Sequence, residues 1–253
     1  MSPSWLERLT LLVHPRRIVV ERRPRRGEPV RKTVEFAAPA DTPALLVAIQ
    51  DLLTSEGRFG AELRVVVADP LVRYALLPWS PLVTGKKARL AMARALLQHA
   101  LGARAETLEI ALDRPLYGHN GIAAGIDRAL LAGLRSSARQ QRLRLSSVQP
   151  SLLAELAARG KDLDDGWLAL IDDGWLALLG VRGGQPGCLR NHRMATADAA
   201  SFAVELAGLL TAEAVAVDGK KVLISSFQTL PASLPGDWSL ASSRPLAWGA
   251  GHA

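Results

Sequence analysis

The chain has very little cysteine and no long apolar run. Its single cysteine, Cys188, excludes an intramolecular disulfide and leaves no cluster of thiolates for zinc. A membrane-spanning helix requires roughly 18–20 consecutive apolar residues, which no segment provides. The segment from Ser2 to Val13 is too short and too polar for a secretory signal. These absences favour a cytoplasmic protein, with a peripheral position at a membrane left open.

Sequence motifs of catalysis are also missing. The Gly85-Lys86 pair does not belong to a phosphate-binding loop, because Ser80 replaces the first glycine and Lys87 replaces the required hydroxyl residue. None of the five histidines has the i, i+4 spacing of a helical metal site, and no serine lies in a Gly-x-Ser-x-Gly motif. His119 is better explained as a surface-loop residue and Cys188 as a small buried hydrophobe than as catalytic groups. We therefore assign no catalytic residue and no metal ligand.

Positive charge, in contrast, is concentrated near the N-terminus. The formal net charge is +7, and the stretch from Arg16 to Lys32 carries +6 of it, with eight basic and two acidic side chains. A basic block can face an anionic membrane, where each residue is worth about 1 kcal/mol, or the phosphates of nucleic acid. No aromatic stacking platform lies nearby, which disfavours nucleic acid, and a solvated hairpin explains the block equally well. The candidate surface for a partner or membrane comprises Arg22, Arg23, Arg25, Arg26, Arg31 and Lys32.

The first half of the chain alternates between patterns typical of strands and of helices. The spacing of Trp5, Leu9, Leu12 and Val13 predicts an N-terminal helix over residues 1–14. Asp41 or Thr42 is a suitable cap for a second helix. The elements expected after residue 14 are strands at Arg17–Arg22 and Val30–Phe36, a helix from Asp41 to Gly57, strands at Leu63–Ala68 and Val72–Trp79, a helix at Lys86–Leu101, a strand at Thr107–Leu112, a helix at Gly125–Arg139, a strand at Arg142–Val148 and a helix from Pro150 to about Arg159.

The second half begins with a near-perfect repeat. Asp164-Asp165-Gly166-Trp167-Leu168-Ala169-Leu170 recurs eight residues later as Asp172-Asp173-Gly174-Trp175-Leu176-Ala177-Leu178. This spacing predicts a β-hairpin whose tight turn is Asp172-Asp173-Gly174. A strand at Cys188–Met194, a helix capped by Thr196, and strands at Ala214–Val217 and Lys221–Ser226 are expected to follow. The predicted organisation is an N-terminal helix (1–14), a first lobe with an inserted subdomain (15–160), a second lobe of β-β-β-α-β order (161–227) and an irregular tail (228–253).

The turn at Asp172, Asp173 and Gly174 is the candidate for nucleotide binding. A hairpin turn can present backbone N–H groups to a phosphate, while an acidic side chain holds Mg²⁺ through water. That chemistry needs a matching turn in the other half of the chain. The apparent counterpart, Arg22–Gly27, has no Asp. Turn formation by itself also explains why these acids precede glycine.

The order of elements resembles the actin-like (ribonuclease H-like) ATPase fold, a two-lobed α/β fold. Each half of that fold is built on β-hairpins followed by alternating helices and strands. The segment Val65-Val66-Val67-Ala68-Asp69-Pro70-Leu71-Val72-Arg73-Tyr74-Ala75-Leu76-Leu77-Pro78-Trp79 resembles the strand-turn-strand of the PilM/GspL/MshI group. That group comprises assembly proteins of type IV pili and type II secretion. The resemblance covers roughly residues 15–226 and is carried by hydrophobic patterns.

The resemblance implies a cytoplasmic scaffold at the inner membrane that grips the N-terminal tail of a membrane-anchored partner. PilM-like members bind ATP, whereas GspL-like domains have largely lost that ability. This chain keeps only the Asp-x-Gly core of the second phosphate motif, without the Thr that usually follows, and lacks the membrane helix of GspL. We therefore expect a stand-alone, soluble scaffold without catalysis and without a cofactor. Two alternatives stay open: an active ATPase using ATP and Mg²⁺ at Asp172, and a nucleic-acid-binding protein.

Overall fold

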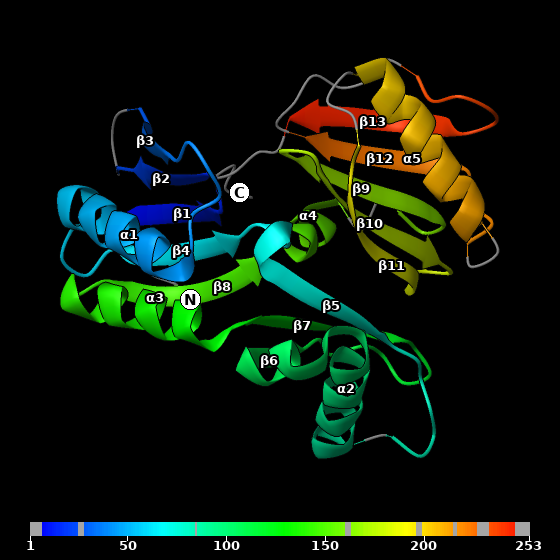
Figure 1. Ribbon diagram of the computed structural model, residues 1–253, viewed down its shortest axis with the longest axis horizontal. Helices are drawn as coiled ribbons and strands as arrows, with labels where there is room; N and C mark the ends of the chain where they lie inside the picture. The colour runs from blue at the N-terminus through cyan, green and yellow to red at the C-terminus, as the bar shows by residue number, and fades with distance from the viewer. Residues whose placement is uncertain are drawn as a thin grey trace.

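Three β-sheets and the helices that cover them form the computed structural model of the protein (Figure 1). The structure describes residues 7–24, 28–83, 85–159, 163–195, 199–214, 217–226 and 233–245. The first sheet contains, in spatial order, β3 (Val30–Glu35), β2 (Arg17–Arg23), β1 (Arg8–His14), β4 (Glu62–Val67) and β8 (Arg144–Pro150). The second contains β11 (Gln185–Arg193), β10 (Trp175–Arg182), β9 (Gly166–Asp172), β12 (Lys221–Ser226) and β13 (Ser239–Pro245).

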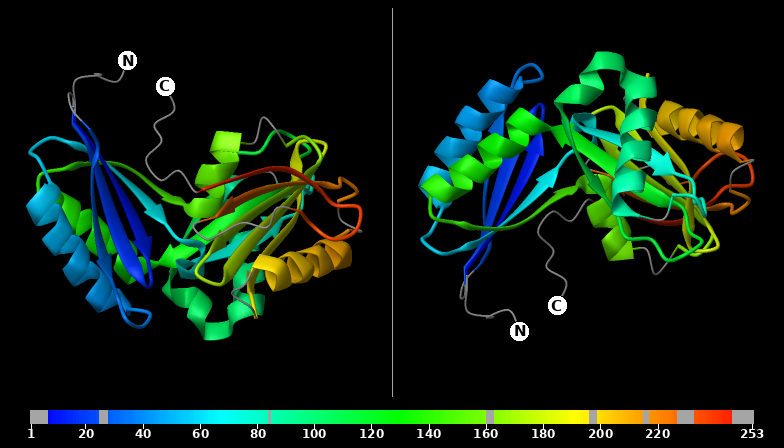
Figure 2. Two further views of the ribbon diagram at one scale, coloured as in Figure 1. Left: turned by 90° about the horizontal axis from the view of Figure 1, so that it is seen from above. Right: turned by 90° about the horizontal axis from the view of Figure 1, so that it is seen from below.

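The two five-stranded sheets repeat one topology. In each sheet the first three strands pair antiparallel, and the other two run parallel to the central strand. The central strands are β1 and β9, so the β1–β2 and β9–β10 hairpins occupy equivalent places. A helix joins the third strand to the fourth in both halves, α1 (Thr42–Glu56) in the first and α5 (Ala199–Glu213) in the second. Figure 2 shows these two equivalent halves side by side.

A smaller antiparallel sheet is inserted in the first half between β4 and β8. It contains, in spatial order, β5 (Val72–Leu77), β7 (Gly121–Asp127) and β6 (Leu108–Leu112). The short 3₁₀ helices η1 (Asp69–Leu71) and η2 (Gly102–Thr107) precede β5 and β6. Helix α2 (Lys86–Leu101) covers this sheet through Ala93 and Leu97, which pack against Ala75 and Leu77. The inserted sheet also reaches the second half, because β5 lies alongside β11.

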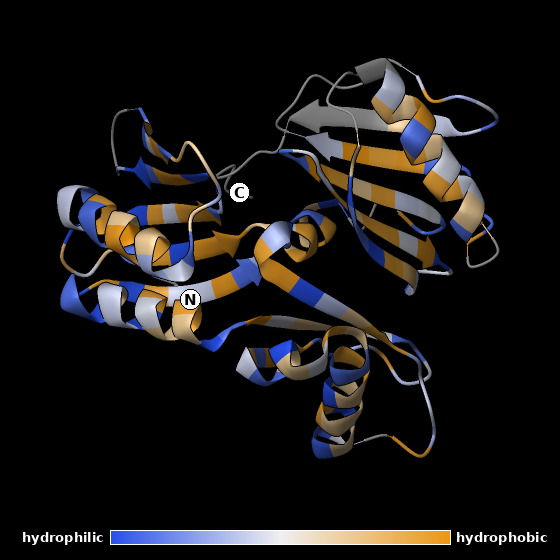
Figure 3. Cartoon of the chain, in the orientation of Figure 1, coloured by the Kyte–Doolittle hydropathy of each residue, from blue (hydrophilic) through white to orange (hydrophobic). Residues whose placement is uncertain are grey.

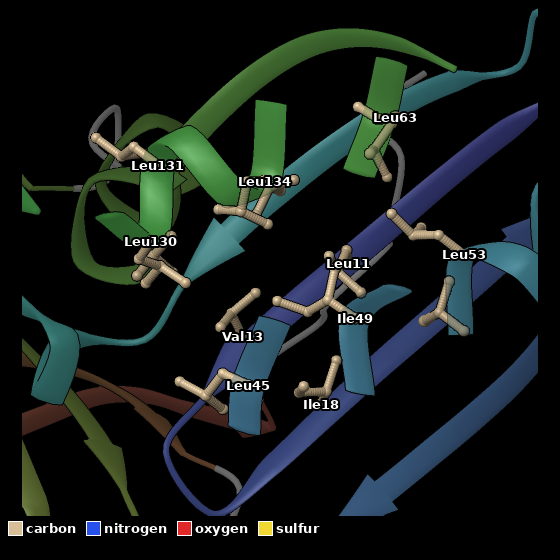
Figure 4. Close-up of a cluster of buried hydrophobic side chains, with 14 of the residues drawn as sticks. Leu11, Val13, Ile18, Leu45, Ile49, Leu53, Leu63, Leu130, Leu131 and Leu134 are labelled. Carbon is tan, nitrogen blue, oxygen red and sulfur yellow. The ribbon is translucent and has the colours of Figure 1, made fainter. Parts of the chain in front are cut away.

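The core of the first half lies between its sheet and the helices α1 and α3 (Arg128–Gln140). Asp41 caps α1 as predicted, because its side chain accepts a hydrogen bond from the Ala44 N–H at 2.9 Å. Each fully buried aliphatic side chain of this core is worth about 1.5–3 kcal/mol. The residues labelled in Figure 4 are Leu45, Ile49 and Leu53 of α1, Leu130, Leu131 and Leu134 of α3, and Leu11, Val13, Ile18 and Leu63 of the sheet.

The second sheet is covered on both faces. Helix α5 packs on one face through Phe202 and Leu206. Leu152 of α4 (Ser151–Arg159) and Ile122 of β7 pack on the other, so α4 lies between the two halves (Figure 1). All residues of β9 are consequently buried, and β9 and β10 are largely apolar in Figure 3. Two-sided burial explains the long apolar runs of the repeated hairpin.

The predicted N-terminal helix is wrong over its described residues. Residues 8–14 form β1, whereas residues 1–6 lie outside the described part of the chain. This strand is hydrogen-bonded to β2 on one side and to β4 on the other. Leu9, Leu11, Leu12 and Val13 are all buried. A central strand that is covered on both faces is apolar on both faces. The resulting run of apolar residues in β1 also contains the spacing of a helical stripe, which explains the wrong prediction.

Another misplaced boundary concerns the helix predicted at Gly125–Arg139. Gly125 belongs to β7, and α3 begins after Asp127, whose side chain accepts hydrogen bonds from the N–H groups of Ala129 and Leu130. The small residues of β7 conceal this strand in the sequence. They are required by close packing: a Cβ at Gly125 would lie 2.9 Å from Leu108 Cδ1.

The C-terminal region also differs from the prediction. The tail expected to be irregular contains β13, which pairs in parallel with β12 and completes the second sheet. Ala214 and Val217, predicted to lie in a strand, are outside any strand. The predicted cap Thr196 lies outside the described residues. β13 has the polar sequence Ser-Leu-Ala-Ser-Ser-Arg-Pro at an edge of the sheet, which gives no apolar signal.

Candidate functional site

The β9–β10 hairpin ends in the tight turn that its sequence predicts. Asp172 and Trp175 are paired across the hairpin, leaving Asp173 and Gly174 as the two loop residues. Both have positive φ, +48° at Asp173 and +73° at Gly174. This is the type I′ geometry that matches the twist of a β-hairpin and favours Asp-Gly. The turn points the two acidic side chains toward the first half.

The counterpart of this turn in the first half is Pro15-Arg16, between β1 and β2. His14 and Arg17 are paired across that hairpin, and β1 is equivalent to β9 in its sheet. The counterpart expected at Arg22–Gly27 is therefore wrong. Arg22 and Arg23 belong to β2, and residues 25–27 lie outside the described part of the chain. The error follows from the misassigned N-terminal helix, which hides the first hairpin.

The two turns meet through two ion pairs. Arg17 Nη2 donates a hydrogen bond to Asp172 Oδ1. Arg16 Nε lies 3.1 Å from Asp173 Oδ2. The Asp172 side chain is only 4% exposed and that of Arg17 19%, whereas those of Arg16 and Asp173 are 44% and 37% exposed. The first pair is thus largely shielded from water, and the second lies at the surface.

His14 lies behind the Arg17–Asp172 pair and is neutral. Its Nδ1 accepts a hydrogen bond from the Arg16 N–H at 3.1 Å, which places the imidazole proton on Nε2. Burial lowers the pKa of His14 to about 3, and the charges of Arg17 and Arg16 add to that effect. Its Nε2 is 3.8 Å from Asp172 Oδ2. This contact is therefore no ion pair at neutral pH.

A third acid, Asp69, is buried at the same junction. Its Oδ1 accepts hydrogen bonds from the Tyr74 O–H at 2.5 Å and the Leu152 N–H at 3.3 Å. Burial, with a smaller contribution from the nearby charge of Asp172, raises the pKa of Asp69 to about 7 against the opposing effect of the hydrogen bonds from Tyr74 and Leu152. Burial also raises the pKa of Asp172, against the opposing effect of Arg17. The burial of Asp69 at the junction cannot be predicted from the sequence, because Asp69-Pro70 has the pattern of an ordinary turn.

A hollow of about 440 Å³ lies beside the facing turns. His14, Pro15 and Arg16 line one side of it. Asp173 and Gly174 line the other. The predicted turn residues Asp173 and Gly174 therefore border open space, whereas Asp172 is enclosed behind them.

Three residues of the basic candidate surface, Arg22, Arg23 and Lys32, are paired with acids of the first half. Lys32 Nζ lies 2.5 Å from Glu56 Oε1, and Arg22 Nε lies 3.5 Å from Glu56 Oε2. These cations lower the pKa of Glu56, with the Lys32 hydrogen bond as the largest cause. Arg23 Nε lies 2.8 Å from Glu21 Oε1. Of the remaining candidates, Arg31 is exposed, and Arg25 and Arg26 lie outside the described residues.

The other two residues weighed from the sequence lie away from the turns. Cys188 is buried, as predicted, and its Sγ lies 3.3 Å from Glu213 Oε2. Burial raises the pKa of this thiol to about 12, so it is no nucleophile at neutral pH. His119 lines a separate hollow on the inserted sheet. Neither residue belongs to the junction.

Comparison with known proteins identifies the fold. No family model and no curated protein sequence matches the chain. The cytoplasmic domain of EpsL, an inner membrane component of the type II secretion system of Vibrio cholerae, has a TM-score of 0.58 at 15% identity, over 94% of this chain and 89% of that chain. The PilM–PilN type IV pilus biogenesis complex gives a TM-score of 0.56 at 18% identity, over 88% and 82%.

A third similar structure names the fold directly. A Bacteroides thetaiotaomicron protein with an actin-like ATPase fold and unknown function has a TM-score of 0.57 at 11% identity, over 90% of this chain and 84% of that chain. The chain therefore has the actin-like fold, as its sequence predicts. Its likeness to pilus and type II secretion assembly proteins is confirmed at the level of the fold. Among the helices of the described residues, none is long and apolar enough to cross a membrane.

Proposed function

We propose that this protein is a non-catalytic scaffold of a pilus or type II secretion assembly machine. The proposal is based on the ion pair between Arg17 and Asp172. A second ion pair, between Arg16 and Asp173, lies beside it at the surface. In actin-like ATPases the equivalent turns hold the phosphates of a nucleotide between them. In this chain the guanidinium groups of one turn bind the carboxylates of the other. The ion pairs thus hold the halves together where a nucleotide would otherwise do so.

The residues at the turns do not fit a magnesium–nucleotide group. A Mg²⁺ ion would need oxygen ligands such as the carboxylate of Asp172, one oxygen of which already accepts a hydrogen bond from Arg17. The positive charges of Arg16 and Arg17 repel a divalent cation at this position. His14 adds no negative charge. We therefore derive no nucleotide step from this site.

The partner that fits this proposal is a membrane-anchored assembly protein on the cytoplasmic side of the inner membrane. The similar structures include an inner membrane component of type II secretion and a complex of PilM with PilN. Direct binding of an anionic membrane or nucleic acid by the basic segment is a weaker proposal, because Arg22, Arg23 and Lys32 already have acidic partners. Protein contacts therefore explain membrane association better than the charge block does.

Cell fractionation tests the scaffold function. A tagged copy expressed in its native cells is expected to sediment with the inner membrane. Deleting the membrane-anchored pilus or secretion component encoded beside it is expected to move the protein to the soluble fraction. Arg31→Ala serves as a matched control for direct membrane binding by basic residues and is expected to leave sedimentation with the inner membrane unchanged. Sedimentation that persists without the anchor, or a protein that never sediments, contradicts the proposal.

An active actin-like ATPase is the second candidate, and the hollow of about 440 Å³ beside the turns favours it. In that case the Arg16–Asp173 pair would have to open so that phosphates could reach the turn. ATP binding that requires Mg²⁺ and is lost in Asp172→Ala distinguishes this candidate from the scaffold.

A further inference from the structure

We propose that a hollow at the outer end of the inserted sheet docks an acidic partner peptide through a bulky apolar side chain. The hollow has a volume of about 260 Å³ and lies between the end of β5, the start of α2 and the loop that joins β6 to β7. It is separate from the facing turns. Its walls include Leu77, Trp79, Met92, Leu116 and Tyr117.

Apolar side chains gather at this hollow without being buried. Leu116 is 73% exposed and Tyr117 83%, and Leu82 on the neighbouring loop is 90% exposed. The rings of Trp79 and Tyr117 form an edge-to-face pair with their centroids 5.5 Å apart. Exposed apolar clusters of this kind mark interaction sites, and aromatic residues commonly act as their anchors. The fold gains nothing from leaving these side chains in water, so a partner that covers them is favoured.

The size of the hollow indicates a peptide anchor. Pockets that enclose whole small-molecule ligands measure about 300–1,000 Å³. This hollow is smaller, at about 260 Å³, and is open on one side to the exposed Leu116 and Tyr117. Such a shape accepts one large side chain while the neighbouring residues of the peptide lie along the rim.

The rim of the hollow is fixed by hydrogen bonds. The Trp79 N–H donates to Asn120 Oδ1 at 2.9 Å. The Asn120 N–H donates to Gln185 Oε1 at 3.2 Å, and Asn120 Nδ2 donates to the Pro186 carbonyl at 3.0 Å. Asn120 therefore ties the β6–β7 loop both to the end of β5 and to the second half. A preformed rim reduces the entropy lost on binding.

The charge around the hollow selects an acidic occupant. Helix α2 carries four basic residues and no acid, and Lys86 and Lys87 lie in its first turn, where Gly85 provides no side-chain cap. Cations are unfavourable at this end of a helix, because the helix dipole is positive there. No acid is among the described residues that line the hollow, and the adjacent Asp113 is bound by Arg89 at 3.0 Å. Carboxylates of a partner therefore complement the charge that this surface leaves unmatched.

This inference deepens the proposed function and rests on it, because a scaffold needs a surface for its partner. Two synthetic peptides test the inference without that partner. Both carry a central Leu-Trp-Leu anchor, flanked by Asp and Glu in one and by Lys in the other. Fluorescence polarisation is expected to show that the acidic peptide binds at least about tenfold more tightly than the basic one, a difference of about 1.4 kcal/mol.

Surface variants identify where the acidic peptide binds. Tyr117→Ala removes an exposed anchor and is expected to weaken binding by about tenfold or more. The double change Lys86→Glu with Lys87→Glu is expected to abolish the preference for the acidic peptide. Val47→Ala changes an exposed apolar residue of α1, 64% exposed, and serves as the matched control with unchanged binding. Equal binding of both peptides, or no effect of Tyr117→Ala, overturns the inference.

Two further measurements exclude other occupants. Self-association in sedimentation velocity that disappears in Tyr117→Ala would assign the hollow to a second copy of the chain. Binding to phosphatidylglycerol vesicles that disappears in the same variant would assign it to a membrane, and either result overturns the peptide site. If neither peptide binds while the protein still fractionates with its membrane anchor, this inference alone fails. If the acidic peptide binds while fractionation fails, the proposed function alone fails.

Discussion

At the scale of single residues, Arg17 is the side chain on which the junction depends most. Replacing it with Ala leaves the Asp172 carboxylate buried next to Asp69 without its cation. Removing one partner of a buried ion pair costs about 3–5 kcal/mol, and the partial exposure of Arg17 favours the lower end. We therefore expect Arg17→Ala to reduce the free energy of unfolding by about 3 kcal/mol in urea titrations.

The neighbouring pair provides the matched control for that variant. Arg16 and Asp173 are 44% and 37% exposed, and exposed ion pairs contribute about 0–1 kcal/mol. Arg16→Ala is therefore expected to lose at most about 1 kcal/mol. Equal losses of unfolding free energy in Arg17→Ala and Arg16→Ala would contradict the stronger contribution of the buried pair.

His14 and Asp69 make the free energy of unfolding depend on pH in opposite directions. His14 stays neutral in the folded protein down to about pH 3, whereas the unfolded chain takes up its proton below about 6.5, so acid lowers stability in that window. Asp69 keeps its proton in the folded protein up to about pH 7, whereas the unfolded chain releases it above about 3.8, so rising pH lowers stability there. Asp172, whose pKa is also raised, acts in the same direction as Asp69.

Substitutions separate these two contributions. In Asp69→Asn the free energy of unfolding is expected to rise more steeply with pH, up to about 6.5, than in the wild type. In His14→Gln it is expected to fall as the pH rises toward 7. Each group contributes a slope of at most about 1.4 kcal/mol per pH unit. Urea titrations at several pH values measure these slopes, and curves parallel to that of the wild type would contradict both assignments.

At the scale of elements, the contact between α1 and α3 depends on a glycine. A Cβ at Gly133 would lie 2.3 Å from Leu46 Cδ2 and 2.9 Å from Leu46 Cγ, so the whole Leu46 side chain would have to move. We expect Gly133→Ala to destabilise the protein by about 1–3 kcal/mol, despite the better helix propensity of Ala.

A second helical glycine tests this explanation. At Gly208 of α5 a Cβ would meet no atom within 4 Å. Helix propensity then acts alone, and Gly208→Ala is expected to stabilise the protein by up to about 1 kcal/mol. Thermal unfolding compares the two variants. A gain in stability for Gly133→Ala similar to that for Gly208→Ala would contradict tight packing of α1 against α3.

The elements that the sequence predicts are those with local signals. The capped start of α1 and the Asp-Gly turn of the β9–β10 hairpin both depend on neighbouring residues. The strands β1, β7 and β13 lack such signals, because their residues are apolar on both faces, small, or polar. At the junction, too, only residues with a local signal can be recognised in the sequence. Asp172, Asp173 and Gly174 have such a signal, because they form a turn. Their partners Arg16 and Arg17 are more than 150 positions away and belong to the misassigned hairpin.

At the scale of the whole molecule, the two halves share part of their core. Leu152 and Ile122 of the first half pack with Leu168, Leu170 and Leu223 of the second. Neither half can unfold without exposing apolar side chains of the other to water, so we expect a single cooperative unfolding transition. Urea titrations followed by tryptophan fluorescence and by far-UV circular dichroism should coincide. Two separated transitions would show that the halves are independent units.

We propose that ion pairs, rather than a nucleotide, join the facing turns. A titration of a fluorescent ATP analogue with Mg²⁺ into the wild type and into Asp172→Ala, followed by fluorescence polarisation, tests this proposal. We expect no saturable binding in either protein and no rise of the wild-type Tm with Mg-ATP. Saturable, Mg²⁺-dependent binding to the wild type that Asp172→Ala abolishes would contradict it.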